Sequence, residues 1–96
     1  MPAYVIVDIR VEDREKFKAY ASAVQDTVSR YRGRYLCKWG NSEDLEGDWR
    51  ANRIVIVEFE NEKFARQWWG SDEYRPLKAL RRESSTARVM LVSQVL

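Results

Sequence analysis

The stretch "YVIVDIRV" (residues 4–11) decides the fold, because its β-branched residues predict a strand whose two faces are both rich in apolar side chains. The stretch "RIVIVEFE" (residues 53–60) has the same character. Since alternate residues of a strand point to opposite faces, one face of this pair is fully apolar: Val5, Val7, Ile9, Val55, Val57 and Phe59. The opposite face carries Ile6, Asp8, Arg10, Ile54, Ile56 and Glu58. We therefore expect two central strands with helices packed on the first face.

Helical patterns separate these strands. Asp13 is a typical N-cap, apolar residues then recur at helical spacing, and Gly33 ends the helix. After the second central strand, Asn61 caps a short helix that Gly70 interrupts, and Ser71 can cap the next helix. In that last helix the basic side chains are expected to be solvated: Arg75, Lys78, Arg81 and Arg82.

Two further strands complete the pattern. They are "RYLCKWG" (residues 34–40) and "ARVMLVSQVL" (residues 87–96), while the polar segment 41–49 predicts a hairpin connection. The order βαββαβ, in a single domain over residues 1–96, predicts an α+β, ferredoxin-like, four-stranded antiparallel sheet with the helices on one face. No helix remains for the second apolar face. A second copy of the chain is expected to cover it, sheet against sheet, in a two-fold homodimer.

Composition argues against several classes of site. The chain has 96 residues, a net charge of +2, no histidine and a single cysteine, Cys37. Because both signs of charge are scattered along the chain, we expect no nucleic-acid partner. Without histidine and with one thiol, we expect no haem, no metal and no other cofactor.

The expected location is the cytoplasm. A lone cysteine cannot form an internal disulfide, which suits a reducing compartment. The N-terminal stretch "MPAYVIVDIR" has neither the layout of a signal peptide nor the length of a membrane span, so no membrane partner is expected.

Five segments resemble one family: "YVIVDIRVEDREKFKAYA", "YRGRYLCKWG", "LEGDW", "RIVIVEFE" and "SDEYRPLKALR". Together they are similar to domain-of-unknown-function family 1330 of the dimeric α+β barrel superfamily, over nearly the whole chain. The resemblance implies the ferredoxin-like fold and a face-to-face dimer, and it brings no established activity. More distant members of the superfamily include cofactor-independent monooxygenases, haem-degrading enzymes, and isomerases or dehalogenases of ring compounds. By fold analogy alone, they imply a small, largely apolar ligand between sheet and helices.

Aromatic residues supply the candidate ligand contacts. Adjacent residues of a helix point about 100° apart, so Trp68 and Trp69 cannot both face the core. We expect Trp68 to pack and Trp69 to be free for another role, with plain packing as the alternative. The candidate ligand-binding residues are Arg10, Trp39, Trp69 and Tyr74.

Asp8, Lys38 and Glu58 are the candidate catalytic residues. Because alternate residues of a strand point to opposite faces, Asp8 and Glu58 are expected on the face away from the helices. Lys38 can share that face from the next strand, and Cys37, one residue earlier, is expected to point toward the helices. Carboxylates gathered in a partly dry space would have at least one raised pKa, which suits a general acid or base, and Lys38 would steady a developing anion. The alternative is an ion-pair cluster that sets the register of the dimer.

These observations predict a small-molecule-binding homodimer of unknown role. The alternative is a cofactor-independent monooxygenase-like or isomerase-like enzyme that acts on a small, largely apolar organic substrate. The absence of histidine removes the commonest general base, so the enzyme ranks second.

Overall fold

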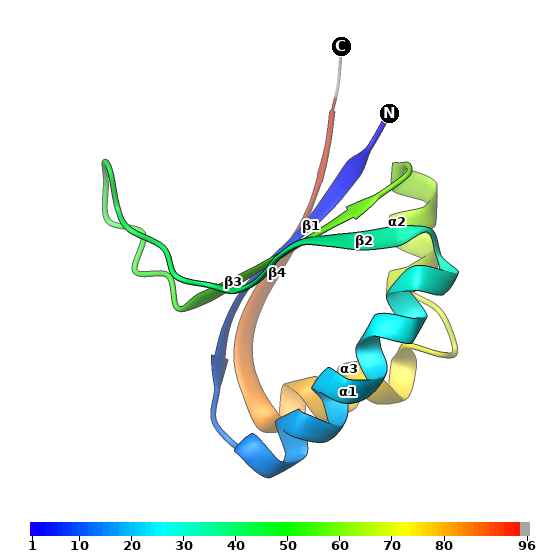
Figure 1. The fold of residues 1–96 in the computed structure, drawn as a ribbon, viewed down its shortest axis with the longest axis horizontal. Coiled ribbons are helices and arrows are strands. Elements are labelled where there is room, and N and C mark those ends of the chain that lie inside the picture. The colour runs from blue at the N-terminus through cyan, green and yellow to red at the C-terminus, as the bar shows by residue number, and fades with distance from the viewer. Residues whose placement is uncertain (95–96) are drawn as a thin grey trace.

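The predicted strand order is confirmed by a computed structural model, which describes residues 1–94. The elements are β1 (Ala3–Val11), α1 (Arg14–Arg30), β2 (Gly33–Gly40), β3 (Arg53–Phe59), α2 (Glu62–Trp69), α3 (Arg75–Ser84) and β4 (Ser85–Ser93). The sheet order is β2-β3-β1-β4 with antiparallel neighbours, so the first and third strands are central (Figure 1). The last predicted strand, 87–96, begins earlier, at Ser85, and its residues 95–96 lie outside the described residues.

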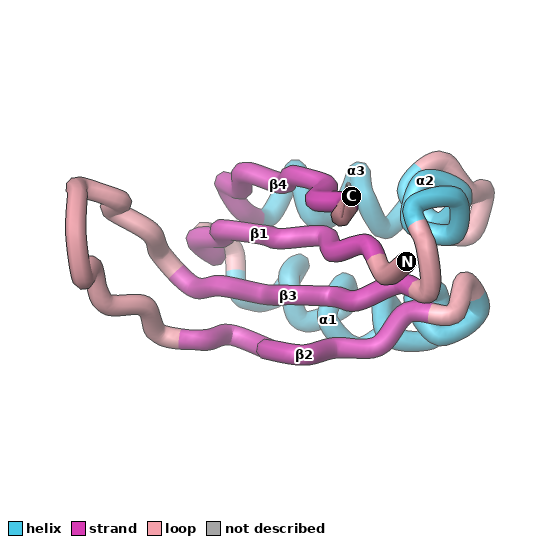
Figure 2. Tube along the Cα trace, turned by 90° about the horizontal axis from the view of Figure 1, so that it is seen from above, coloured by secondary structure: helices cyan, strands magenta, loops and turns pink. Residues whose placement is uncertain are grey.

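Helices α1, α2 and α3 lie on one side of the sheet, and no element within residues 1–94 covers the other side (Figures 1 and 2). The helix-facing side chains of β1 and β3 form the core, with Val5, Ile9 and Phe59 between 0% and 5% exposed. From the helices, Val28 and Trp68 are buried against them. Burying each such side chain stabilises the folded state by about 1.5–3 kcal/mol. The helices therefore pack on the face that carries these side chains.

Two of the predicted helix caps are confirmed. The Asp13 carboxylate accepts a hydrogen bond from the backbone N–H of Lys16 at 3.2 Å. The Asn61 side-chain oxygen accepts one from Phe64 N–H at 3.0 Å. Each bond satisfies a backbone donor that the first turn of a helix leaves free.

The joint between α2 and α3 differs slightly from the prediction. Gly70 ends α2, as expected. The Ser71 hydroxyl donates to the carbonyl of Trp68 at 2.8 Å and accepts from the N–H of Tyr74 at 3.1 Å. Ser71 therefore caps a separate turn, and α3 begins only at Arg75.

Strand β2 departs from regular alternation, and this changes which residues reach the helix side. Its register against β3 shifts between Tyr35 and Cys37 and again between Cys37 and Gly40. An extra residue in a strand reverses the face of the residues that follow. Cys37 therefore lies opposite Ile56, on the face away from the helices, and Lys38 lines a cavity on the helix side. The predictions that Cys37 faces the helices and that Lys38 shares the face of the carboxylates are both wrong for this reason.

The connection between β2 and β3 projects beyond the sheet as an arm (Figure 1). It carries two exposed apolar side chains, Leu45 and Trp49. The indole N–H of Trp49 donates to the carbonyl of Glu46 at 3.0 Å, which holds the tip in a local turn. Within residues 1–94, no helix is both long and apolar enough to cross a bilayer.

Candidate functional site

A cavity of about 120 Å³ lies between the sheet and helices α1 and α3. Its walls are mostly apolar: Val7, Ile9, Ala21, Val24 and Val55. Val7 faces the helices like Val5 and Ile9, but it is only half-buried whereas these two neighbours are buried. Protein cores are normally filled to crystal-like density. The core is therefore not filled beside Val7.

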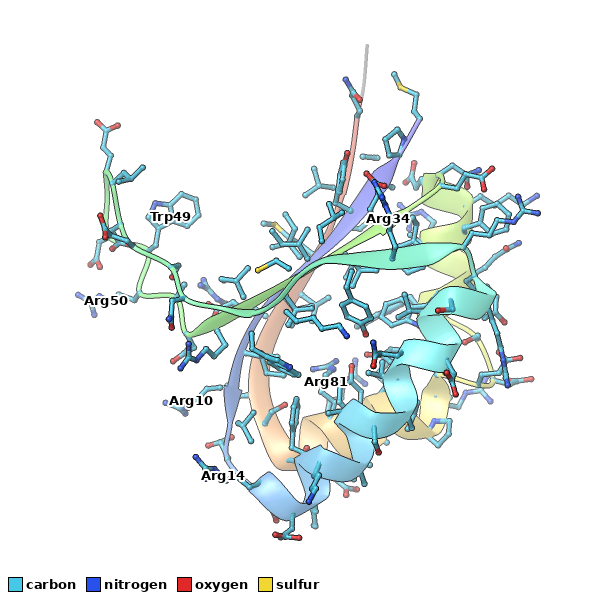
Figure 3. All side chains as sticks on the ribbon, in the orientation of Figure 1. Arg10, Arg14, Arg34, Trp49, Arg50 and Arg81 are labelled. Atoms are coloured by element: carbon cyan, nitrogen blue, oxygen red, sulfur yellow. The ribbon has the colours of Figure 1, made fainter. Side chains whose placement is uncertain are left out.

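Arg81, from α3, lines the cavity (Figure 3). It is one of two charged residues in the lining, and the other is Lys38 from β2. Only 5% of the surface of Arg81 is exposed, and its Nε–H donates to the hydroxyl oxygen of Tyr74 at 3.4 Å. It forms no ion pair with any carboxylate of residues 1–94. Buried arginines normally have such a partner. Arg81 also borders a shallow hollow between α3 and β4.

Two tyrosines add hydroxyl groups to the cavity wall. Tyr20, from α1, and Tyr35, from β2, both line it. The hydroxyl of Tyr20 lies 3.2 Å from that of Tyr74. Burial raises the pKa of Tyr20 strongly and raises the pKa of Tyr35 to about 12. Both are therefore neutral phenols near pH 7, able to donate a hydrogen bond.

Tyr74 itself is 1% exposed and does not line the cavity. Its hydroxyl lies within hydrogen-bond distance of both Tyr20 and Arg81. Tyr74 was predicted to bind a ligand, but the structure places it outside the lining of this cavity. The reason is its position in the joint between α2 and α3, where its ring packs 4.1 Å from that of Trp68.

Trp39 stands at the cavity mouth. Its backbone adopts a φ of 54°, its ring is edge-on to Phe17 at 5.3 Å, and it lines both the cavity and an open outer groove of about 700 Å³. The groove is lined by the basic residues Arg10, Arg14, Lys18 and Arg53. Arg10 is therefore in the groove and outside the cavity, and it pairs with Glu12 at 3.5 Å. Lys38 lies beside Trp39 at the cavity wall, with its Nζ 4.6 Å from the ring centre of Tyr35.

The two tryptophans of α2 differ as predicted from helical geometry. Trp68 is 3% exposed and its indole N–H donates to the Thr27 hydroxyl at 3.0 Å. Trp69 is half-buried under the ammonium of Lys78, whose Nζ lies 4.1 Å from its ring centre. Trp69 does not line the cavity. It lines two hollows against β4, and Arg81 borders one of them.

The two candidate carboxylates lie on the sheet face away from the helices. Asp8 accepts hydrogen bonds from Arg88 at 2.6 Å and from the N–H of Asn52 at 2.7 Å. Burial raises the pKa of Asp8, but these hydrogen bonds outweigh it, so the net pKa is lowered. Glu58 pairs with Arg34 at 2.8 Å. A lowered pKa makes Asp8 a poor general base, contrary to the raised value expected for a catalytic carboxylate.

Asp8, Glu58 and Lys38 are not brought together. Asp8 lies opposite Ile54 and Glu58 opposite Tyr4. Four residues separate these positions along the strand, which corresponds to about 13 Å. The alternation of side chains along a strand correctly put Asp8 and Glu58 on one face of the sheet. It does not show how far apart they lie along the strands, which depends on the pairing register.

Sequence reasoning missed Arg81, which it assigned to solvent. One signal was available: Arg81 follows Leu77 and Tyr74 by four and seven residues, the spacing of the buried side of a helix. Tyr20 and Tyr35 were not among the candidate site residues, because no sequence pattern distinguishes a packed tyrosine from one that lines a cavity.

Comparisons with known proteins bear on family and fold. Residues 2–95 match the sequence model of a family described as Domain of unknown function (DUF1330). Similar solved structures include a protein of unknown function from Rhodopseudomonas palustris, with 15% identity and a TM-score of 0.74, over 99% of this chain and 83% of that one.

Two further structures are similar over nearly their whole length. SnoaB, a cofactor-independent oxygenase from Streptomyces nogalater, has 14% identity and a TM-score of 0.68, over 99% of this chain and 94% of that one. A dimeric ferredoxin-like protein of unknown function from Jannaschia sp. CCS1 has 9% identity and a TM-score of 0.70, over 98% of this chain and 100% of that one. At these identities the similarity shows the fold, which is α+β and ferredoxin-like. A search of curated proteins found no match.

Proposed function

This chain belongs to the DUF1330 family, whose function is not established. We propose that it is a small-molecule-binding homodimer with one binding cavity in each subunit. The observation that carries the proposal is the unfilled space beside Val7, on the helix-covered face of the central strand β1. Stability alone would favour a larger side chain at this position, because each void in a core loses packing energy.

The composition of the cavity suits a small organic ligand. Apolar walls with a few polar groups are typical of such sites. A volume of about 120 Å³ is close to that of a cavity that encloses one benzene ring, about 150 Å³. We infer that the cavity takes a ring-sized or branched apolar group, and that the rest of the ligand passes Trp39 into the outer groove.

The homodimer is proposed to form through the uncovered sheet face. That face presents partly exposed apolar side chains on three strands: Ile6, Ile54, Ile56, Met90 and Val92. A contiguous apolar patch of this kind usually marks an interface. The similar Jannaschia protein is described as dimeric, which supports the proposal. The ion pairs of Asp8 and Glu58 lie near opposite ends of the face and would set the register of the two sheets.

An oxygenase-like or isomerase-like enzyme is the second candidate. Arg81, Lys38 and the tyrosine hydroxyls could stabilise an anion that develops on a substrate, and the similar protein SnoaB is described as a cofactor-independent oxygenase. However, no carboxylate lines the cavity among the described residues, so a general base is missing there. Binding therefore ranks first, and Asp8 and Glu58 are assigned to the interface.

We place the protein in the cytoplasm. Cys37, the single cysteine, is a free thiol, and free thiols are typical of reducing compartments. Cell fractionation with an antibody to the protein tests this proposal, and recovery from the medium or from an oxidising compartment would contradict it.

The dimer is tested by sedimentation velocity at micromolar concentration. We expect the wild type to be dimeric and Ile56→Lys, which places a charge in the middle of the face, to be monomeric. Ser22→Lys, on the exposed side of α1, is the matched control and should remain dimeric. A monomeric wild type, or a dimeric Ile56→Lys protein, refutes the proposed interface.

The cavity is tested with benzene as the probe, in ¹H–¹⁵N NMR spectra. Benzene should shift amide signals near Val7 and Val24 in the wild type. Ala21→Phe should abolish these shifts by filling the cavity, whereas Ala19→Phe, on the exposed side of α1, should leave them intact. Shifts that are absent in the wild type, or unchanged by Ala21→Phe, count against a ligand cavity.

A further inference from the structure

The fold buries the guanidinium of Arg81, and no Asp or Glu within residues 1–94 forms an ion pair with it. A guanidinium has five N–H donors, and one of them, at Nε, bonds to Tyr74. Among the described residues, no fully buried side-chain nitrogen or oxygen lacks a hydrogen-bond partner. The nitrogens of Arg81 that bond to no protein group must therefore touch accessible space. Arg81 lines two such spaces, the cavity and the hollow between α3 and β4, and the cavity is the one that Tyr20 also lines. Because a buried charge is costly without a partner, an anion would bind here with little competition from the protein.

Tyr20 can supply a second donor at the same place. The hydroxyl oxygen of Tyr74 accepts from Arg81, so the Tyr74 O–H is free to donate to the Tyr20 oxygen 3.2 Å away. That arrangement leaves the O–H of Tyr20 without an acceptor among residues 1–94, and Tyr20 lines the cavity. Burial raises the pKa of Tyr20, so the group remains a donor at neutral pH.

The path to Arg81 is also basic. The side chains that line the groove and the cavity include six cationic residues: Arg10, Arg14, Lys18, Lys38, Arg53 and Arg81. The same linings contain no Asp or Glu, and of the six only Arg10 forms an ion pair within residues 1–94. The chain as a whole has a net charge of only +2. This local excess of positive charge would attract an anion to the mouth.

We propose that the cavity binds a carboxylate attached to a small apolar group, with Arg81 as the residue that pairs with the carboxylate and Tyr20 as its second donor. The proposal rests on the proposed function, because it names the ligand class of the same cavity. A planar carboxylate matches the fork of a guanidinium. The walls formed by Val7, Val24 and Val55 suit the apolar group. A neutral ligand would leave Arg81 without a counter-charge, and a cation would be repelled.

Three probes of similar size separate the two proposals: benzene, benzyl alcohol and benzoate. Each is titrated into the wild-type protein at constant ionic strength, and binding is followed by NMR, including the Nε–Hε signal of Arg81. We expect benzoate to bind about tenfold or more tightly than benzyl alcohol, as a charge-assisted hydrogen bond implies. Benzoate alone should shift the Arg81 side-chain signal strongly.

Variants then test the residues. Arg81→Gln should remove the preference for benzoate while benzene still binds, and Arg81→Lys should restore part of it. Arg82→Gln is the matched control, because it makes the same change of charge at the next, exposed residue of α3. Tyr20→Phe should lower the affinity for benzoate a few-fold and leave the affinity for benzene unchanged. If Arg81→Gln does not fold, the wild-type side-chain signal and the Tyr20→Phe variant still decide the question.

Each outcome separates the hypotheses. If benzene binds but benzoate binds no more tightly than benzyl alcohol, carboxylate recognition is refuted and the binding cavity stands. If none of the three probes binds, the proposed function is refuted with it. Equal losses of benzoate binding in Arg81→Gln and Arg82→Gln would show a general surface charge effect and would also overturn the assignment.

Discussion

Replacing Thr27 by valine tests how Trp68 holds α2 against α1. The Thr27 hydroxyl donates to the carbonyl of Val24 at 2.7 Å and accepts from the indole N–H of Trp68 at 3.0 Å. Both side chains are buried, at 6% and 3% exposure. Valine has the same shape without the hydroxyl, so the indole N–H loses its acceptor in a place that water cannot reach. The carbonyl of Val24 keeps its helical hydrogen bond and adds little to the cost.

The expected loss of unfolding free energy is about 2 kcal/mol, since a buried donor without a partner costs about 1–3 kcal/mol. For a domain of this size, that loss corresponds to a fall in Tm of about 8–16 °C. Urea unfolding followed by far-UV circular dichroism measures it. All variants are compared at one protein concentration, because the stability of a dimer depends on concentration.

A double-mutant cycle identifies the cause. In a Trp68→Phe background no indole N–H remains, so Thr27→Val should cost much less, with a coupling energy of about 1–2 kcal/mol. Thr27→Ser keeps the hydroxyl and should lose less stability than Thr27→Val. If Thr27→Val costs the same in both backgrounds, its effect does not come from the indole hydrogen bond, and the role given to Trp68 is wrong.

Two further predictions concern pH. The pKa of Asp8 is lowered below its ordinary value of 3.8, so its stabilising contribution is present above about pH 4 and is lost as pH falls through the folded-state pKa. The urea midpoint of Asp8→Asn should therefore fall less between pH 4 and pH 2 than that of the wild type. Asp26→Asn, at an exposed position, is the control. If the midpoint falls equally in Asp8→Asn and in the wild type, Asp8 does not contribute to stability. The pKa of Tyr35 is raised by burial to about 12, so its contribution is complete below about pH 10 and is lost as pH rises toward 12. A tyrosinate absorbance step near pH 12 should be present in the wild type and missing in Tyr35→Phe, and an unchanged titration would contradict the buried position of Tyr35.

Much of the fold followed from local pattern. The alternation of Val5, Val7 and Ile9 placed one face of β1 under the helices, and Asp13 and Asn61 marked two helix starts correctly. Such features depend on residues a few positions apart, because the period of a strand and the geometry of a cap are properties of a short segment. The two apolar faces of the sheet were visible in the same way.

The site depended on contacts between distant segments. The register shifts in β2 turned Lys38 to the helix side, and alternation alone cannot show where a strand gains an extra residue. Asp8 and Glu58 share a face but lie at separate positions, which only the pairing register determines. Arg81 became a candidate because α1, α3 and the sheet leave a cavity beside it. The sequence by itself determined the strands, their buried face and the helix caps; the tertiary structure decided which polar groups meet, because that depends on how segments far apart in the chain pack.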